Sequence, residues 1–122
     1  MQNSNIKYDL KQRTLLFSKN LLSILLSVKR TPINQNLIIQ CLRSGTSIGA
    51  NYHEADGAES RKDFEHKLGI CKKEAQETEY WLTLLIHLKE KTESLNPLLD
   101  ESEQLRKIFV AIINKSKASR IS

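Results

Sequence analysis

Residues 60–88 read SRKDFEHKLGICKKEAQETEYWLTLLIHL, and this stretch decides the fold. Its first residues, Ser60-Arg61-Lys62-Asp63, resemble the capping box that opens an α-helix, with Asp63 in place of the usual Glu or Gln. The residues that then recur in alternating steps of four and three are Phe64, Leu68, Cys71, Ala75, Thr78, Leu82 and Leu85. That spacing is typical of helices packed in a left-handed bundle, so we predict a helix over 60–91.

The segment before it predicts a second long helix, over 33–56. The residues that share one face at spacings of three and four are Ile38, Leu42, Gly45, Gly49 and Tyr52. Glycine costs about 1 kcal/mol relative to alanine inside a helix, so Gly45 and Gly49 together indicate that another helix comes close. The alternative is that this run of small residues is a loop. Gly57 follows at the position of a C-terminal cap.

Two further helices flank this pair. The first should cover 6–29 and end before Thr31-Pro32, because Pro32 cannot continue a helix but suits the first turn of the next one. Asn96-Pro97 has the pattern of an N-cap and first residue, which predicts a helix over 97–114. The basic and polar residues 115–122 are expected to fray.

Four helices with three short connections predict an all-α fold, an antiparallel up-down four-helix bundle. At 122 residues the chain is expected to form a single domain over 1–122. Each helix of such a bundle needs one apolar stripe, but the helices over 6–29, 60–91 and 97–114 carry more than one. The excess would be an exposed patch unless a partner covers it, which predicts a homo-oligomer. The alternative is a tightly packed monomer with unusually wide stripes.

No segment indicates a membrane or secreted protein. No apolar run approaches the roughly 20 residues that cross a bilayer, and the polar residues 1–13 lack the apolar region of a signal peptide. Cys41 and Cys71 lie far apart in helical stretches, where free thiols of a reducing compartment are the simplest interpretation. We therefore expect a cytoplasmic protein.

The net charge of +5 is unevenly distributed along the chain. Residues 1–53 carry seven Lys or Arg and one acid, residues 54–103 carry seven and thirteen, and residues 104–122 carry five and none. Such segregation suits either nucleic-acid binding or attraction between subunits. The bases predicted to contact nucleic acid are Lys11, Arg13, Lys19, Lys29, Arg30, Arg106 and Lys107. No aromatic run accompanies them, so the expected contacts are with phosphates and not with bases.

The sequence offers no pattern for catalysis or metal binding. A di-metal site in a helical bundle needs two Glu-x-x-His motifs, and only Asp63-x-x-His66 approaches that spacing. Gly45 and Gly49 lack the lysine and the strand of a phosphate-binding loop. We therefore predict a non-enzymatic protein with no cofactor and no metal.

Four charged residues are assigned a structural role: Arg43, Glu54, Glu74 and Glu77. Arg43 lies among small residues where another helix should come close, so its cation should be either buried with an acid or directed at a phosphate. Glu74 and Glu77 are candidate partners because an antiparallel hairpin places the second and third helices side by side. An ion pair with Glu54 is a further candidate, and we favour a structural role over a phosphate contact.

An ordered set of motifs runs from Gln40 to Leu85. Its members are Arg43-Ser44-Gly45-Thr46-Ser47-Ile48-Gly49-Ala50-Asn51, Glu54-Ala55, Ser60-Arg61-x-Asp63-Phe64, Lys73-Glu74-Ala75 and Glu79-Tyr80-Trp81-Leu82. This set resembles the bacterial four-helix bundle family that is also called the S23 or 23S rRNA intervening-sequence protein family. The helix pattern on both sides agrees, so the resemblance covers nearly the whole chain.

The resemblance implies a bundle that assembles as a ring, typically a pentamer. Some members are encoded within intervening sequences of 23S rRNA genes, and a related branch comprises basic accessory proteins of diversity-generating retroelements, which bind nucleic acid and a reverse transcriptase. We therefore expect a homo-oligomeric accessory protein that binds RNA or DNA and, in a retroelement setting, a reverse transcriptase. The alternative is a protein-scaffolding module whose basic face meets an acidic partner.

Overall fold

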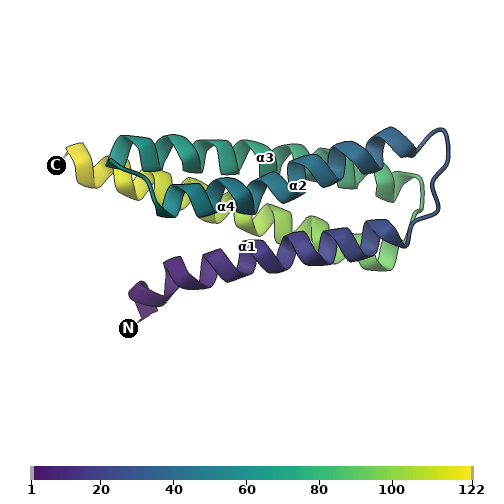
Figure 1. The fold of residues 1–122 in the computed structure, drawn as a ribbon, viewed down its shortest axis with the longest axis horizontal. Coiled ribbons are helices and arrows are strands. Elements are labelled where there is room, and N and C mark those ends of the chain that lie inside the picture. Colours follow the sequence, from purple (N-terminus) through teal and green to yellow (C-terminus); the bar gives the residue numbers. More distant parts are fainter. Residues whose placement is uncertain (1, 122) are drawn as a thin grey trace.

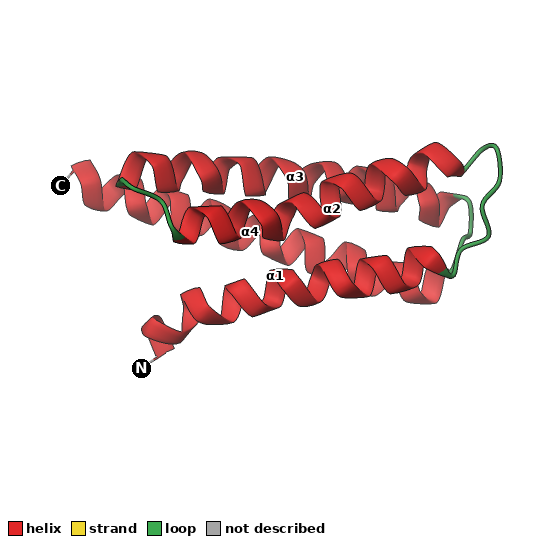
Figure 2. Cartoon of the chain, in the orientation of Figure 1, coloured by secondary structure: helices red, strands yellow, loops and turns green. Residues whose placement is uncertain are grey.

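The structure is a computed structural model that describes residues 2–121, with the side chains of residues 10–119. It contains, in chain order, the helices α1 (Gln2–Leu26), α2 (Gln35–Asp56), α3 (Arg61–His87) and α4 (Thr92–Ile121). Successive helices run in opposite directions and are joined at the ends of the bundle by short loops, as Figure 1 and Figure 2 show. No strand occurs in residues 2–121. The predicted all-α four-helix bundle is confirmed.

Helix α3 starts with the cap that its sequence indicates. Ser60 has an extended backbone, and its side chain accepts a hydrogen bond of 3.0 Å from the backbone N–H of Asp63. The helix ends at His87 and not near Lys91, where the sequence places its end. The reason is local, because Lys89 and Lys91 have φ angles of 61° and 34° and a right-handed helix cannot continue through them.

Helix α4 begins a turn earlier than the sequence predicts. The backbone N–H of Leu95 donates to the carbonyl of Lys91 at 2.9 Å, so the helix is already formed when it reaches Asn96. Pro97 therefore lies inside α4 and is not its first residue. Proline has no backbone N–H, so α4 lacks one i→i−4 hydrogen bond in its second turn.

The C-terminal end of α4 is also longer than predicted. Residues 115–121 are helical where the sequence predicts a frayed tail, and Ser122 lies outside the described residues. Side-chain contacts attach this segment to α3. Ser116 Oγ donates to a carboxylate oxygen of Glu65 at 2.7 Å, and Arg61 donates to Ser119 Oγ at 3.0 Å.

The α1–α2 connection is organised by one buried amide. Helix α1 ends at Leu26 and α2 begins at Gln35, so both boundaries differ from the predicted 29 and 33. Asn34 is fully buried, and its Oδ1 accepts a hydrogen bond of 2.8 Å from the backbone N–H of Thr31. Its Nδ2 donates to the carbonyl of Lys29 at 3.0 Å and to Glu90 at 2.7 Å, which ties this connection to the α3–α4 turn.

Gly45 and Gly49 allow α1 and α2 to approach closely. A Cβ atom at Gly49 would lie 3.3 Å from the backbone oxygen of Thr14, and one at Gly45 would lie 2.1 Å from Leu21 Cδ2. The prediction of a close helix contact is confirmed, and the loop alternative is wrong because both glycines lie within α2. The second helix ends at Asp56, with Gly57 at its C-cap in a conformation of negative φ.

The four helices do not contact one another equally. Helix α3 packs along both α2 and α4, whereas α1 packs mainly on α2 and touches α4 much less. Figure 1 shows α1 diverging from the other helices towards its N-terminus. Tyr52 of α2 and Phe109 of α4 meet in the core, with ring centroids 6.2 Å apart. The outer side of α1 and α2 therefore lies opposite the outer side of α3 and α4.

Candidate functional site

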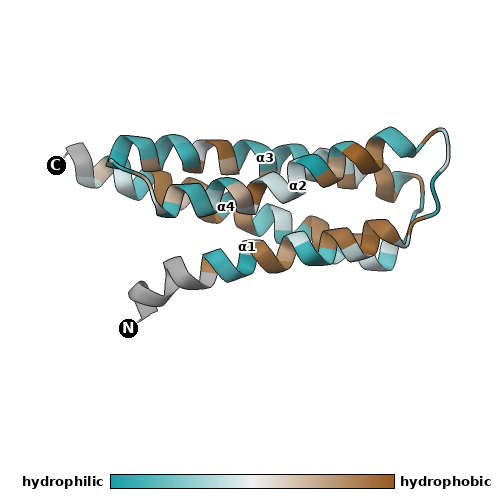
Figure 3. Cartoon of the chain, viewed as in Figure 1, coloured by the Kyte–Doolittle hydropathy of each residue, from teal (hydrophilic) through white to brown (hydrophobic). Residues whose placement is uncertain are grey.

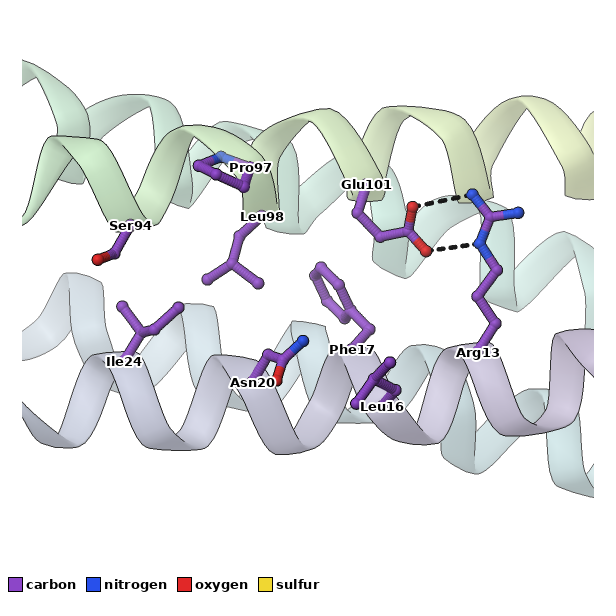
Figure 4. A pocket seen from close by; sticks show the side chains of 9 residues that line it. All are labelled: Arg13, Leu16, Phe17, Asn20, Ile24, Ser94, Pro97, Leu98 and Glu101. Carbon is purple, nitrogen blue, oxygen red and sulfur yellow. Dashed lines mark hydrogen bonds and ion pairs between the residues drawn. The ribbon is translucent and has the colours of Figure 1, made fainter.

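Arg13, one of the bases predicted to contact nucleic acid, forms a two-pronged ion pair across the bundle. It donates to both carboxylate oxygens of Glu101 on α4, at 2.6 and 2.8 Å, as Figure 4 shows. A third hydrogen bond of 3.0 Å reaches the side chain of Gln104. This paired geometry fixes the guanidinium in place, so its charge is largely compensated by the bundle itself.

Two more of the predicted bases are also paired with carboxylates. Lys11 of α1 lies 3.4 Å from Asp56 at the end of α2. Arg106 of α4 lies 2.5 Å from Glu79 of α3, and this contact raises the pKa of Arg106. Both pairs join neighbouring helices, so Lys11 and Arg106 help to hold the bundle together in addition to any contact with nucleic acid.

The other four predicted bases are exposed. Lys19 lies on α1, Lys29 and Arg30 lie in the α1–α2 connection, and Lys107 lies on α4. None of the four forms an ion pair with any residue whose side chain the structure describes. Of the four, only Lys29 and Arg30 are adjacent in the chain.

Arg43 contacts both of its predicted partners on α3. Its Nη2 donates to Glu77 Oε2, and its Nη1 lies 3.8 Å from Glu74 Oε1. Trp81 Nε1 donates to the same oxygen of Glu77 at 3.3 Å. The expectation of a buried arginine is wrong, because half of its side chain is exposed. Glu54 does not join this cluster.

Glu54 pairs instead with Lys67 of α3. The Lys67 ammonium donates to Glu54 at 2.8 Å, and this bond raises the pKa of Lys67. On α2, Glu54 lies three turns beyond Arg43, so the two side chains contact different parts of α3. Both nevertheless join α2 to α3.

The carboxylate of Glu74 is poorly satisfied. Its Oε1 is buried and has no hydrogen-bond partner in the described part of the chain. Burial raises the pKa of Glu74, the neighbouring charge of Glu77 raises it further, and Arg43 opposes both effects. The positive charge of Arg43 therefore offsets part of the free-energy cost of burying the Glu74 carboxylate where α3 contacts α2.

Buried polar groups that the sequence did not single out lie in the contacts of α3 with α2 and with α4. Thr78 Oγ1 donates to Ser44 Oγ at 2.9 Å, and Ser102 Oγ donates to the carbonyl of Ala75 at 3.0 Å. Cys41 and Cys71 are both buried, which raises the pKa of each thiol to about 12. At neutral pH these thiols stay protonated and are poor nucleophiles.

The cleft between α1 and α4 offers no evident chemistry. It has a volume of about 280 Å³ and is lined mainly by apolar and small side chains, among them Phe17, Pro97 and Leu98. Its only charged lining residues are Arg13 and Glu101, which neutralise each other. Such a pair positions helices but supplies neither a nucleophile nor a free base.

A second notable surface is apolar and lies on the outer side of α1 and α2. We call it the α1–α2 apolar surface, and its residues are Leu15, Leu22, Leu26, Ile39 and Leu42. Leu22 and Leu26 share a hollow of about 210 Å³ with Leu42. Leu26 is 87% exposed, and Figure 3 shows hydrophobic residues concentrated in the C-terminal half of α1.

The position of this surface corrects the sequence-based expectation. Excess apolar residues were expected on the first, third and fourth helices. Large exposed ones occur on α1, on α2 as Ile39, in the α1–α2 connection as Ile33, on α3 as Tyr80 and just after α3 as Leu88. None occurs among the described side chains of α4. The apolar residues of α4 instead complete the core or pack against it.

Comparison with known proteins identifies the family of this chain. The sequence profile of the 23S rRNA-intervening sequence protein family matches residues 7–111. The chain belongs to this family. The resemblance seen in the motifs between Gln40 and Leu85 is thereby confirmed.

A solved structure supports membership of the 23S rRNA-intervening sequence protein family. It is the crystal structure of a protein of unknown function from the S23 ribosomal protein family of Bacteroides thetaiotaomicron. The two chains share 36% sequence identity, over 88% of this chain and 97% of the other, with a TM-score of 0.77. No curated protein is detectably similar in sequence.

The described residues of this family member contain neither a metal-binding cluster nor a membrane-spanning helix. No group of three or more His, Cys, Asp or Glu side chains lies together in a way that could hold a metal ion. None of the described helical segments is both long enough and apolar enough to cross a membrane.

Proposed function

We propose that this protein is a non-enzymatic, homo-oligomeric accessory protein that binds nucleic acid through phosphate contacts. The observation that carries the proposal is how the charges of the bundle are used. Carboxylates on α2, α3 and α4 are engaged in ion pairs between helices, while exposed bases such as Lys19, Lys29 and Lys107 have no such pair among the described residues. A chain of net charge +5 therefore presents positive charge to solvent.

The family supports the same setting. Its name connects it with intervening sequences of 23S ribosomal RNA. The Bacteroides relative is described as a protein of unknown function, so it adds the fold and not an activity. The retroelement branch implied by the sequence motifs adds a reverse transcriptase to the proposed partners.

Self-association is the second part of the proposal. The α1–α2 apolar surface exposes several large side chains side by side, and contiguous apolar surfaces of this kind on soluble proteins mark interaction sites. The partner that we propose for this surface is a second copy of the same chain, because other copies are always present with it. A closed ring, such as the pentamer implied by the resemblance, would cover this surface in every subunit.

Nucleic-acid binding is tested by titrating unrelated RNA and DNA oligonucleotides of equal length at 50 mM and 200 mM salt. Binding by phosphate charge should be similar for unrelated sequences and should weaken steeply at the higher salt. Absence of binding at the lower salt would contradict the proposal.

A scaffolding role is the other candidate, and one observation favours it. Arg30 lines the hollow of the α1–α2 apolar surface, and Lys19 lies within about one helical turn of Leu15 and Leu22 on α1, so an acidic protein could complement this surface. This candidate predicts that unrelated nucleic acids fail to bind while an acidic protein partner, such as an acidic surface of a reverse transcriptase, is retained. The oligonucleotide titration therefore separates the two candidates.

A further inference from the structure

A groove between α3 and α4 has features that the charge pattern of the sequence did not reveal. It has a volume of about 420 Å³ and lies on the outer side of these helices. Lys62, His66 and Lys72 of α3 line one side, and Lys117 of α4 lines the other. Gly69 and Ile113 lie between them.

Gly69 keeps the groove open. A Cβ atom at this position would meet nothing within 4 Å, so no close helix contact requires glycine there. Its backbone is ordinary as well, because no glycine of the described chain has a positive φ. Glycine is unfavourable inside a helix. The effect of Gly69 that the structure shows is that no side chain at this position fills the groove.

The groove is positively charged. Lys62, Lys72 and Lys117 form no ion pair with any residue of the described chain. The one acid in the lining, Glu65, is only 7% exposed and accepts a hydrogen bond of 2.7 Å from Ser116. Its charge is therefore held in the wall of the groove, while Lys62 and Lys117 are exposed to solvent and Lys72 is partly exposed.

The spacing of the lysines fits a linear polyanion. Lys62 and Lys72 are ten residues apart on α3, which is about 15 Å along the helix axis. One nucleic-acid strand carries a charge about every 3.4 Å along its duplex axis, so this length corresponds to roughly four phosphates. No Phe, Tyr or Trp side chain lines the groove, so stacking of bases on such rings is not expected there.

We propose that the α3–α4 groove binds the sugar–phosphate backbone of one nucleic-acid strand. This inference rests on the proposed nucleic-acid binding and assigns it to residues outside the set predicted from sequence, namely Lys62, Lys72 and Lys117. The groove lies on the opposite side of the bundle from the α1–α2 apolar surface. Both surfaces can therefore be occupied in the same subunit.

The first test removes charge from the groove. The double variant Lys72→Gln with Lys117→Gln is compared with the double variant Lys89→Gln with Lys91→Gln, which removes the same charge from the α3–α4 turn. Loss of two phosphate contacts lowers the slope of log Kd against log salt by about 1.4 for a single strand. The weakening of binding between 50 mM and 200 mM salt should then shrink roughly sevenfold in the groove variant and stay near the parental value in the other.

The second test fills the groove without changing charge. Gly69→Gln places a neutral side chain in the space, whereas Gly69→Ala adds only a Cβ that meets nothing. Both substitutions replace a helical glycine, so neither should lower the melting temperature. We expect Gly69→Gln to weaken oligonucleotide binding severalfold and Gly69→Ala to bind like the parent.

The outcomes of the two tests distinguish the groove assignment from the proposed nucleic-acid binding on which it rests. If the parent protein binds no oligonucleotide at 50 mM salt, the proposed function fails and the groove assignment fails with it. A second outcome is that the parent binds while the groove variants bind as tightly as the parent, or no more weakly than the control variant at Lys89 and Lys91. In that case only the groove assignment is overturned. Selective loss in the groove variants supports both.

Discussion

Arg43 bridges two carboxylates of α3 although half of its side chain is exposed to solvent. An exposed ion pair stabilises a protein by about 0–1 kcal/mol, because water screens the charges and ordering two long side chains costs entropy. The larger effect comes from Glu74, whose Oε1 is buried without a hydrogen-bond partner among the described residues. Arg43 supplies the nearest compensating charge.

The Arg43→Ala variant should therefore be destabilised by about 1 kcal/mol at pH 7, which corresponds to a fall in Tm of roughly 4 °C for a domain of this size. Burial raises the pKa of Glu74 in the folded protein above its ordinary value of 4.5, and loss of Arg43 raises it further. A raised carboxyl pKa costs stability at neutral pH, and this cost disappears once the pH falls below the unfolded value. Thermal melts at pH 7 and pH 4 should show the deficit shrinking in acid.

Lys67→Ala is the control for this prediction. It removes the partner of Glu54, which is exposed, so no buried carboxylate is left unpaired and little pH dependence is expected. If Arg43→Ala melts like the parent at pH 7 and binds nucleic acid more weakly, Arg43 belongs to the binding surface and its structural role is refuted.

The partners of Arg43 could be predicted from the sequence, but its exposure could not. An antiparallel hairpin places Glu74 and Glu77 beside Arg43 whatever the details of packing. Exposure depends on the rotation of α2 about its own axis, and a single residue step turns a helix by about 100°. Small neighbours such as Gly49 indicated burial, yet they face α1, whereas Arg43 faces α3.

At the scale of the helices, two glycines that both lie inside a helix have different roles. Gly49 of α2 lies against the backbone of α1, where a Cβ would be 3.3 Å from the oxygen of Thr14. Gly69 of α3 faces open space. The same substitution should therefore have opposite effects at the two positions.

Gly49→Ala should lower the free energy of unfolding by about 1 kcal/mol, because overpacking costs about 1–3 kcal/mol and the better helix former returns about 1. Gly69→Ala should raise it by about 0.5–1 kcal/mol, since only the helix preference changes. Urea denaturation of both variants tests the pair. Equal shifts of the two midpoints would show that α1 does not constrain Gly49.

The helix termini show where sequence patterns succeed and fail at this scale. Ser60 could be recognised because its cap uses a side chain and a spacing that the sequence displays. The end of α3 could not, because Lys89 and Lys91 adopt positive φ without being glycine. Asn96-Pro97 was misleading, because α4 is already formed before this pair and contains Pro97 in its second turn at the cost of one backbone hydrogen bond.

At the scale of the whole molecule, the described chain exposes more large apolar side chains on α1 than on any other helix, Leu22 and Leu26 among them. The sequence showed that the chain has more apolar residues than one core needs. It could not show where the excess would lie, because the helices rotate to bury whichever stripes pack best. Helix α4 buries or partly buries nearly all of its apolar residues, and α1 does not.

The double variant Leu22→Gln with Leu26→Gln should dissociate the proposed oligomer, because it replaces the centre of the α1–α2 apolar surface with polar groups. Leu16→Gln is the control, since Leu16 is also exposed on α1 but lines the cleft beside α4. Light scattering coupled to size exclusion should give a monomer mass for the double variant and the parental mass for the control. A parent that is already monomeric at micromolar concentration refutes self-association.

The sparse contact between α1 and α4 affects how the bundle opens locally. Helices α2, α3 and α4 share most of the packing, whereas α1 is held chiefly by α2 and by the Arg13–Glu101 pair. Cooperative units with fewer buried contacts open at lower free energy than the rest of a protein. We expect α1 to detach and redock as a unit, so hydrogen exchange should protect its amides least among the four helices. Breaking the link with Glu101→Gln should speed exchange in α1 and leave the rates of α3 unchanged.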